Sequence, residues 1–187
     1  MKKIAIFASG DGSNAEAIVK YFASNDNIKV EIVLSNRLSA GVHERMARLN
    51  IPSITFTKED WQQSYKIIDK LNELSIDIIV LAGFLTIIQP PIIKAFIDRI
   101  INIHPSLLPR HGGAGMWGMN VHRSVLEVGD RESGITIHYV DESVDSGEII
   151  AQYKCEVKND DTPESLANRV HSLEHYYFPR VIEKILS

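Results

Sequence analysis

The chain has 187 residues, with 20 Lys or Arg, 24 Asp or Glu and a formal net charge of -4. This length suits a single domain with a sizeable core, and the weakly acidic balance favours neither nucleic acid nor a membrane surface as a partner. The 1 cysteine excludes an internal disulfide and suits a reducing compartment, so the expected location is the cytoplasm. No apolar stretch reaches the length of a signal peptide core or a transmembrane helix.

Strands and helices are expected to alternate in the first half of the chain. Short apolar segments predict strands at 4–8, 28–34, 76–82 and 97–103. Three of them are almost continuously apolar, as parallel strands buried on both faces are. Helical periodicity predicts helices over 15–22, 42–49 and 61–74, and Pro90-Pro91 opens a short one. This order predicts an α/β fold with an open, mostly parallel, Rossmann-like sheet and helices on both of its faces.

The second half has a different pattern. Ile135, Ile137 and Tyr139 alternate with other residues, and 149–157 also alternates. These segments predict half-exposed strands, antiparallel and near a sheet edge. Thr162-Pro163 offers a capping hydroxyl and a proline for the first helical position, so a long helix should follow.

Asn102 and His104 stand at the end of the predicted strand 97–103, directly before Pro105. Residues two apart on a strand point to the same face, and a proline cannot continue the ladder. In open α/β sheets, ligands bind outside the carboxyl ends of the strands. An amide and an imidazole there can polarise a carbonyl group and handle its proton. The simpler alternative is a histidine that bonds to a loop, but two polar groups at the end of a buried strand require a reason.

The turn 9–14, Ser-Gly-Asp-Gly-Ser-Asn, joins the first predicted strand to the first helix. Gly12 would let backbone N–H groups approach an anion at a helix N-terminus, and Ser13 and Asn14 add donors. The glycine spacing also fits a dinucleotide fingerprint, but the second strand ends without the carboxylate that NAD requires. A phosphate site is therefore favoured over NAD, while Arg37 leaves NADP open and a plain capped turn is the structural alternative.

Acidic residues gather at 141–148, where the usual interpretation is a solvated turn, and this holds for Asp141 and Glu142. Asp145 differs because it precedes a Ser-Gly pair, a sharp turn that can aim its carboxylate inward. Beside His104, that carboxylate would stabilise an imidazolium.

Two further features have both a structural and a functional interpretation. Glu174 lies next to the apolar face of the last helix, so it either reaches out from the core edge or binds a ligand. The apolar run 81–88 is either core or a flat wall for an aromatic ligand. The remaining histidines lack metal-ligand spacing, and we predict no metal site.

Taken together, these segments resemble the phosphoribosylglycinamide formyltransferase family, folate-dependent enzymes of purine biosynthesis. The resemblance covers nearly the whole chain, and its motifs lie at 10–14, 81–84, 102–109, 144–147 and 174–175. The run Asn-x-His-Pro-Ser-Leu-Leu-Pro is specific to the wider group of formyl-folate transferases and hydrolases. The Gly-Ser-Asn turn and Glu174 narrow the resemblance to this family.

The resemblance implies transfer of the formyl group of 10-formyltetrahydrofolate, a co-substrate, to the amine of 5-phosphoribosylglycinamide, without a metal. It implies one formyltransferase domain over 1–187, with a phosphate-binding half at 1–100 and a catalytic and folate-binding half at 101–187. The implied catalytic residues are Asn102, His104 and Asp145. The implied ribonucleotide ligands are Gly12, Ser13, Asn14 and Glu174. The implied folate-binding residues are Leu85, Thr86, Ile87, Ile88, Asn102, Asp141, Glu142, Ser143, Val144 and Asp145.

The nearest alternative is a 10-formyltetrahydrofolate hydrolase, which passes the formyl group to water and needs no phosphate turn. A methionyl-tRNA formyltransferase would need a tRNA-binding domain and a basic surface. A non-catalytic nucleotide-binding module would leave Asn102, His104 and Asp145 without a purpose. Small-molecule substrates are therefore the expected partners, with no nucleic acid or membrane, and nothing in the sequence indicates an oligomer.

The glycine-rich segment 110–119 follows the catalytic motif and must lie near the site. Its 4 glycines make it costly to order, while Met116, Trp117 and Met119 give it apolar side chains to bury. We expect a mobile lid that packs down when substrates bind. The alternative is a rigid loop that Trp117 docks permanently on the body.

Overall fold

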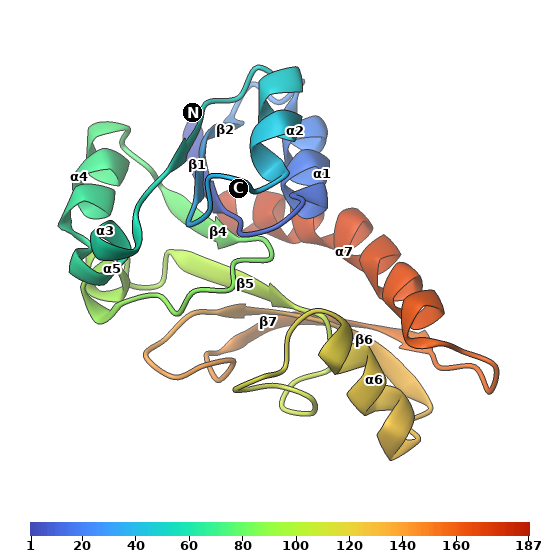
Figure 1. Cartoon of the computed structure of the whole chain (residues 1–187). Helices are drawn as coiled ribbons and strands as arrows, with labels where there is room; N and C mark the ends of the chain where they lie inside the picture. Colours follow the sequence, from blue (N-terminus) through green and yellow to red (C-terminus); the bar gives the residue numbers. More distant parts are fainter.

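One seven-stranded sheet runs through the computed structural model, which describes residues 1–187, in the order β3-β2-β1-β4-β5-β6-β7 (Figure 1). The strands are β1 Lys2–Phe7, β2 Ile28–Ser35, β3 Ser53–Thr55, β4 Ile78–Leu81, β5 Ile100–His104, β6 Glu132–Tyr139 and β7 Ile149–Glu156. The helices are α1 Ser13–Phe22, α2 Val42–Arg48, α3 Lys58–Gln63, α4 Tyr65–Glu73, α5 Pro90–Ala95, α6 Met119–Val128 and α7 Pro163–Leu186.

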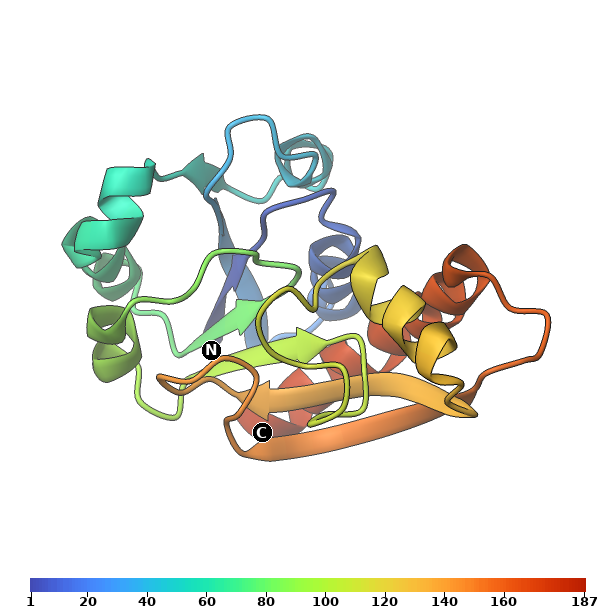
Figure 2. The same ribbon diagram turned by 60° about the horizontal axis from the view of Figure 1, so that its bottom comes forward.

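Strands β1 to β5 pair in parallel, whereas β6 and β7 are antiparallel and form one edge of the sheet (Figure 2). The predicted α/β class, the mostly parallel sheet and the antiparallel strands of the second half are confirmed. No helix is long and apolar enough to cross a bilayer.

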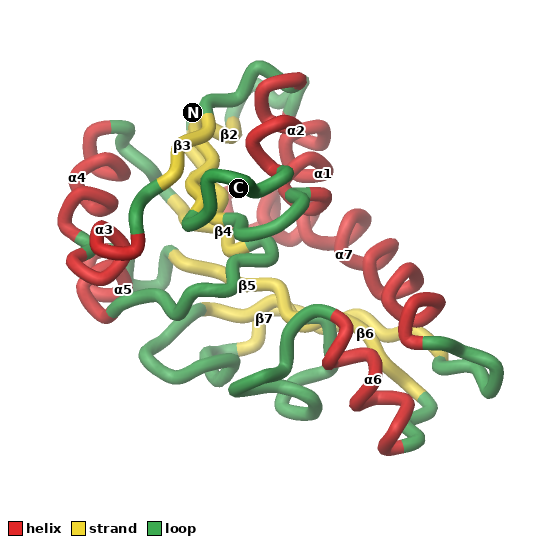
Figure 3. The backbone as a smooth tube through the Cα atoms, in the orientation of Figure 1, coloured by secondary structure: helices red, strands yellow, loops and turns green.

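Two apolar clusters cover the two faces of the sheet. Along β1, Ile4 and Ile6 belong to a cluster that includes side chains of α1, α2, α6 and α7, whereas Ala5 and Phe7 belong to a second cluster with α3, α4 and α5. Figure 3 shows α3, α4 and α5 on one side of the strands and α1, α2 and α7 on the other. Because both faces of β1 are covered, its sequence is apolar without alternation.

The strand order reverses beside β1, which lies between β2 and β4. At such a switch point, loops diverge from the carboxyl ends of neighbouring strands and leave a crevice. The turn after β1 and the loop after β4 are tied together there, since Ser9 Oγ accepts a hydrogen bond of 2.9 Å from the Leu85 N–H and the Ser9 N–H donates to the Gly83 carbonyl at 3.0 Å.

The single helix predicted over 61–74 is wrong, because Ser64 adopts a left-handed φ of 67° and separates α3 from α4. Trp61 of α3 and Ile67 of α4 are both buried in the same cluster. In one continuous helix, the six-residue separation would place Ile67 about 120° around the helix from Trp61. The break lets both side chains face the sheet.

One boundary, one exposure and two further elements also differ from expectation. The strand predicted from 97 begins at Ile100, because Ile97 is exposed. Strand β6 is not half-exposed: its residues from Ser133 to His138 are all buried, and the loop after β5 covers Thr136, whose Oγ1 accepts a hydrogen bond from the Leu108 N–H. Helix α6 and the three-residue edge strand β3 were not predicted.

Candidate active site

A cavity of about 710 Å³ opens where the carboxyl ends of β4 and β5 meet the start of α1. Ligand pockets of about 300–1,000 Å³ are usual for small molecules. The walls come from the loop after β4, the end of β5, the glycine-rich loop before α6, the loop between β6 and β7, and one face of α7. No group of three or more His, Cys, Asp or Glu side chains is arranged to hold a metal ion.

Most predicted site residues line this cavity. Its wall includes the three predicted catalytic residues, Asn14, Glu174 and the predicted folate-binding residues Leu85, Thr86, Ile87, Ile88, Asp141, Glu142, Ser143 and Val144. Gly12 and Ser13 are not part of the wall. They lie directly before Asn14, where Gly12 is the N-cap residue of α1 with a left-handed φ of 81°.

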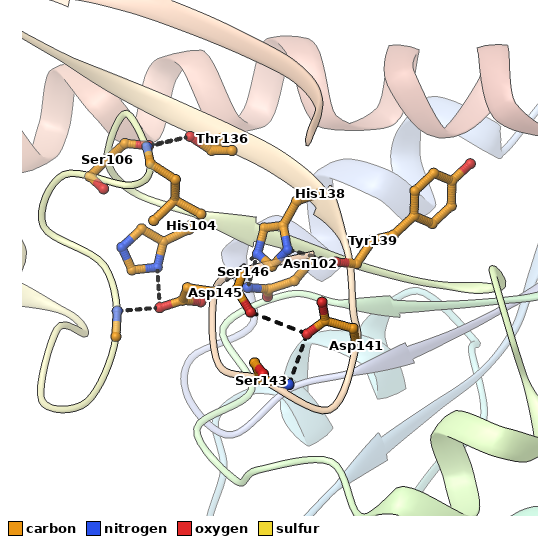
Figure 4. Close-up of polar contacts among 12 residues, drawn as sticks. Asn102, His104, Ser106, Thr136, His138, Tyr139, Asp141, Ser143, Asp145 and Ser146 are labelled. Carbon is orange, nitrogen blue, oxygen red and sulfur yellow. Dashed lines mark hydrogen bonds and ion pairs between the residues drawn. The ribbon is translucent and has the colours of Figure 1, made fainter. Parts of the chain in front are cut away.

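His104 is buried and has a different partner at each ring nitrogen. Nε2 lies 2.8 Å from the backbone oxygen of His111, and because a carbonyl can only accept, this nitrogen carries a proton. Nδ1 faces Asp145 Oδ2 at 3.5 Å (Figure 4). A second proton at Nδ1 would therefore face a carboxylate, which stabilises positive charge on the ring.

The loop between β6 and β7 aims Asp145 at His104. Asp145 has a φ of 55°, a left-handed conformation that costs a non-glycine residue roughly 1–2 kcal/mol. Asp141 Oδ1 accepts a 2.8 Å bond from the Ser143 N–H and shapes the loop (Figure 4). A Cβ on Gly147 would lie 1.8 Å from the Tyr139 carbonyl oxygen, so only glycine allows the loop to close against β6. The sharp turn expected after Asp145 is present.

His138 fixes the orientation of the Asn102 amide. His138 Nδ1 donates to the Tyr139 carbonyl at 2.8 Å, which leaves Nε2 to accept from Asn102 Nδ2 at 3.1 Å. Burial lowers the pKa of His138 and keeps the ring neutral in this acceptor role. The second N–H of the Asn102 amide remains available for a substrate oxygen.

Asn14 and Glu174 meet across 160 positions of sequence in another part of the wall. Asn14 Nδ2 donates to Glu174 Oε2 at 2.8 Å, and Nε2 of His171 lies 3.4 Å from the same oxygen. Burial raises the pKa of Glu174, against the opposing effects of Asn14 and His171. At 5% exposure, Glu174 does not reach out to solvent. Asn14 Oδ1 is buried without a partner, so the pair can accept hydrogen bonds from a polyhydroxyl ligand.

The segment 81–88 is partly core and partly wall. Leu81 and Ile88 are buried in the apolar cluster beside α3 to α5, whereas Leu85 and Ile87 are exposed along the cavity. Thr86 Oγ1 accepts a 2.7 Å bond from Asn36 Nδ2, which ties this loop to the end of β2. An apolar rim beside the polar His104 and Asp145 suits a flat aromatic ligand.

Sequence reasoning did not find His138, His122 in the wall, or the contact of the His111 carbonyl with His104, whereas the glycine-rich segment expected near the site does line the cavity from Gly113 to Met119. The signal for His138 lies in strand register: β5 pairs with β6 so that Asn102 is opposite His138. The alternation in the sequence of β6 indicates an antiparallel strand. It does not say which residue of β6 lies opposite Asn102, so the register could not be predicted.

Comparisons with known proteins agree over the whole chain. A family model described as formyl transferase matches residues 2–182. Phosphoribosylglycinamide formyltransferase of Bacillus subtilis (strain 168) is 38% identical, over 100% of this chain and 95% of the relative. The chloroplastic phosphoribosylglycinamide formyltransferase of Arabidopsis thaliana is 40% identical, but the chain spans only 65% of its length. The crystal structure of glycinamide ribonucleotide transformylase 1 from Geobacillus kaustophilus superposes with a TM-score of 0.91 at 36% identity, covering 100% of both chains.

Proposed function

This chain belongs to the formyl transferase family, and within it to the phosphoribosylglycinamide formyltransferases of purine biosynthesis, and we propose that its cavity joins 10-formyltetrahydrofolate to 5-phosphoribosylglycinamide. Enzymes of this family generally take a formyl-folate as co-substrate and act on small molecules. The hydrolase alternative is not favoured, because the similar proteins of known name are transferases. The further proposal concerns which residues of this chain do the work.

The two substrates occupy different parts of the site, and the phosphate lies just beyond the cavity wall at the start of α1. The backbone and side chains at Gly12, Ser13 and Asn14 bind the 5′-phosphate at the N-terminus of α1, where the helix dipole favours an anion. Glu174 accepts hydrogen bonds from ribose hydroxyls. The pterin of the folate lies against 85–88, and the loop 141–145 closes over it.

Asn102, His104 and Asp145 carry the transfer. The substrate amine attacks the formyl carbon, forming a new C–N bond while the carbonyl electrons move to oxygen. Asn102 Nδ2–H and protonated His104 stabilise that oxyanion, and Asp145 stabilises the charge on His104. Collapse of the oxyanion breaks the bond to N10 of the folate, and the proton lost by the amine ends on N10.

The observation that supports this role is the position of His104, on the cavity wall between Asp145 and the His111 carbonyl. We expect His104→Ala to lower kcat by about 10²–10³-fold, the usual effect of removing one oxyanion stabiliser. Folding is checked by circular dichroism and Tm. His43→Ala is the matched control, because His43 bonds to Ser53 and Thr55, away from the cavity wall.

Product analysis distinguishes transfer from hydrolysis. The wild-type protein and 10-formyltetrahydrofolate are incubated with and without the ribonucleotide, and both formylated product and free formate are measured. Consumption of folate only when the ribonucleotide is present supports the transferase. Equal formate release in both reactions, or near-normal transfer by a folded His104→Ala variant, would refute the proposal.

Small molecules are the only partners that this proposal requires. The weakly acidic charge and the 1 cysteine keep the cytoplasm as the proposed location. The division into a phosphate-binding half at 1–100 and a catalytic and folate-binding half at 101–187 also remains a prediction.

A further inference from the structure

Residues 111–113, here called the brace, contact both members of the His104–Asp145 pair. The backbone carbonyl of His111 accepts from His104 Nε2 at 2.8 Å. Two residues later, the backbone N–H of Gly113 donates to Asp145 Oδ2 at 2.9 Å. Any shift of this short segment would therefore move the imidazole and the carboxylate together.

The His111 side chain ties the brace to the body of the protein. Its Nδ1 lies 2.8 Å from Ser124 Oγ on α6, and its Nε2 lies 2.9 Å from Asp130 Oδ2, just after that helix. The side chains of His111 and Asp130 are each 8% exposed. Because a carboxylate only accepts, His111 Nε2 carries a proton, and the Ser124 hydroxyl can donate to Nδ1. Both ring nitrogens are thus satisfied in one orientation.

The unfavourable backbone conformation of His111 explains why its side chain needs these two bonds. Its φ of 53° is left-handed, which is unfavourable for a residue with a Cβ. This conformation accompanies a carbonyl that points at His104. The two side-chain bonds hold the residue there, and α6 is in turn held by Val125 in the main apolar cluster.

We infer that His111 is a positioning residue for formyl transfer, because its imidazole holds the brace that aligns His104 and Asp145. While the His111 carbonyl occupies Nε2 of His104, only Nδ1 of that ring can exchange a proton in the cavity. The inference rests on the proposed role of His104 and adds to it a group that touches neither substrate.

His111→Ala tests the inference directly. We expect kcat to fall about 10- to 100-fold, as small misplacements of catalytic groups do, while both KM values change little. Nitrogen NMR of the ring of His104 supplies a second measurement: Nε2 should be fully protonated in the wild-type protein and should lose that uniform state in the variant. A folded variant with wild-type kcat and an unchanged His104 ring would overturn the inference.

Two further variants separate positioning from general damage. His111→Gln keeps a donor toward Asp130 and should recover part of the lost kcat. Arg110→Ala is the control, because it removes the other ion-pair partner of Asp130 and leaves the His111 bond in place; its kcat should match the wild type. Equal losses in His111→Gln, His111→Ala and Arg110→Ala would show a structural effect and contradict the inference.

A double variant distinguishes this inference from the proposed function. If His111 acts through His104, adding His111→Ala to His104→Ala should cause no further loss of kcat. A full additional loss would contradict the inference. If His104→Ala alone kept normal activity, the proposed function would fail, whereas an inactive His104→Ala beside a fully active His111→Ala would overturn only the role of His111.

Discussion

At the scale of single residues, replacing Asp145 with asparagine removes the charge of the side chain and keeps its shape. Asn tolerates the left-handed φ of 55° and can still accept from the Gly113 N–H, but it has no charge for His104. We expect Asp145→Asn to lower kcat by about 10²-fold or more, because the positive charge at the oxyanion loses its counter-ion. Steady-state kinetics measures the loss. Glu148→Gln, an exposed carboxylate of the same loop, should leave kcat unchanged, and a full-rate Asp145→Asn would exclude a charge-based role.

We expect the buried carboxylate of Glu174 to lower the stability of the fold at pH 8 and to improve binding of the ribonucleotide. Burial raises its folded-state pKa above the ordinary value of 4.5, so its neutral form favours the fold at low pH, and that contribution is lost as pH rises through the raised pKa. Glu174→Gln should therefore raise Tm at pH 8 and lose this gain at about pH 4. A hydrogen bond to a charged group contributes about 1.5–3 kcal/mol, so KM for the ribonucleotide should rise about 10- to 100-fold.

The control for this effect is Glu164→Gln, an exposed carboxylate in the first turn of the same helix. It should raise Tm at neither pH. If Glu174→Gln lowered Tm at pH 8 as much as at low pH, the buried carboxylate would not be a destabilising group, and the assigned direction of its pKa would be wrong.

Residue type and spacing were enough to predict some residues of the cavity wall but not others. Asn102 and His104 were predictable because polar side chains at the end of a buried strand are costly without a function. His138 was not, because its contact with Asn102 depends on the register between β5 and β6. His111 acts through its backbone carbonyl, and a carbonyl group is present at every position, so the residue type carries no signal for that contact.

At the scale of elements, the turn between β1 and α1 depends on the conformation of one glycine. Gly12 has a φ of 81°, and a Cβ there would lie 2.5 Å from Val42 Cγ2 of α2. Gly12→Ala should therefore destabilise the protein by about 2 kcal/mol or more, since both the left-handed backbone and the contact with α2 oppose it. Denaturant unfolding measures the change. Gly10→Ala is the control, because a Cβ at Gly10 meets nothing within 4 Å; an equal effect of both substitutions would contradict the argument.

The elements themselves were predictable where one apolar pattern persisted over a full helix or strand, as in β1, β2 and α7. The prediction of one helix over 61–74 was wrong because the apolar residues before and after Ser64 do not lie on one face of a continuous helix. Helix α6 was missed because it begins at Met119, directly after the glycine-rich loop, and has no side-chain cap at its start. Its apolar face is short, with Val121 and Val125 as its buried aliphatic residues.

At the scale of the whole molecule, each proposed subsite draws on both halves of the chain. Asn14 of the first half bonds to Glu174 of the second, and the wall 85–88 shares its cavity with 141–145. The β4–β5 pairing places Leu81 beside Asn102 and joins the two halves in one sheet. Neither half therefore holds a complete site. The proposed division by substrate describes only which half supplies most of the residues proposed to bind each substrate.

The glycine-rich loop lines this shared cavity from Gly113 to Met119 and has two unlike parts. The brace is anchored by His111 and Gly113, but Trp117 in the tip leaves 55% of its surface exposed while lining the cavity. A tryptophan that docked the loop permanently on the body would be buried. We therefore expect 114–118 to close when both substrate analogues bind, because burying Trp117 and excluding water from the formyl carbon offset the cost of ordering the glycines.

Fluorescence can follow that closure, because the chain has only 2 tryptophans and Trp61 is buried at 3% exposure. Binding of both analogues should shift the emission of Trp117 to shorter wavelength, and Trp117→Phe should remove that shift. Hydrogen exchange should show new protection at 114–118, while 111–113 is protected before and after binding. Strong protection of the tip in the free protein, unchanged by the analogues, would mean a rigid loop. In that case the exclusion of water would have to come from the folate itself and from 141–145, and Trp117→Phe should then leave the ratio of transfer to hydrolysis unaltered.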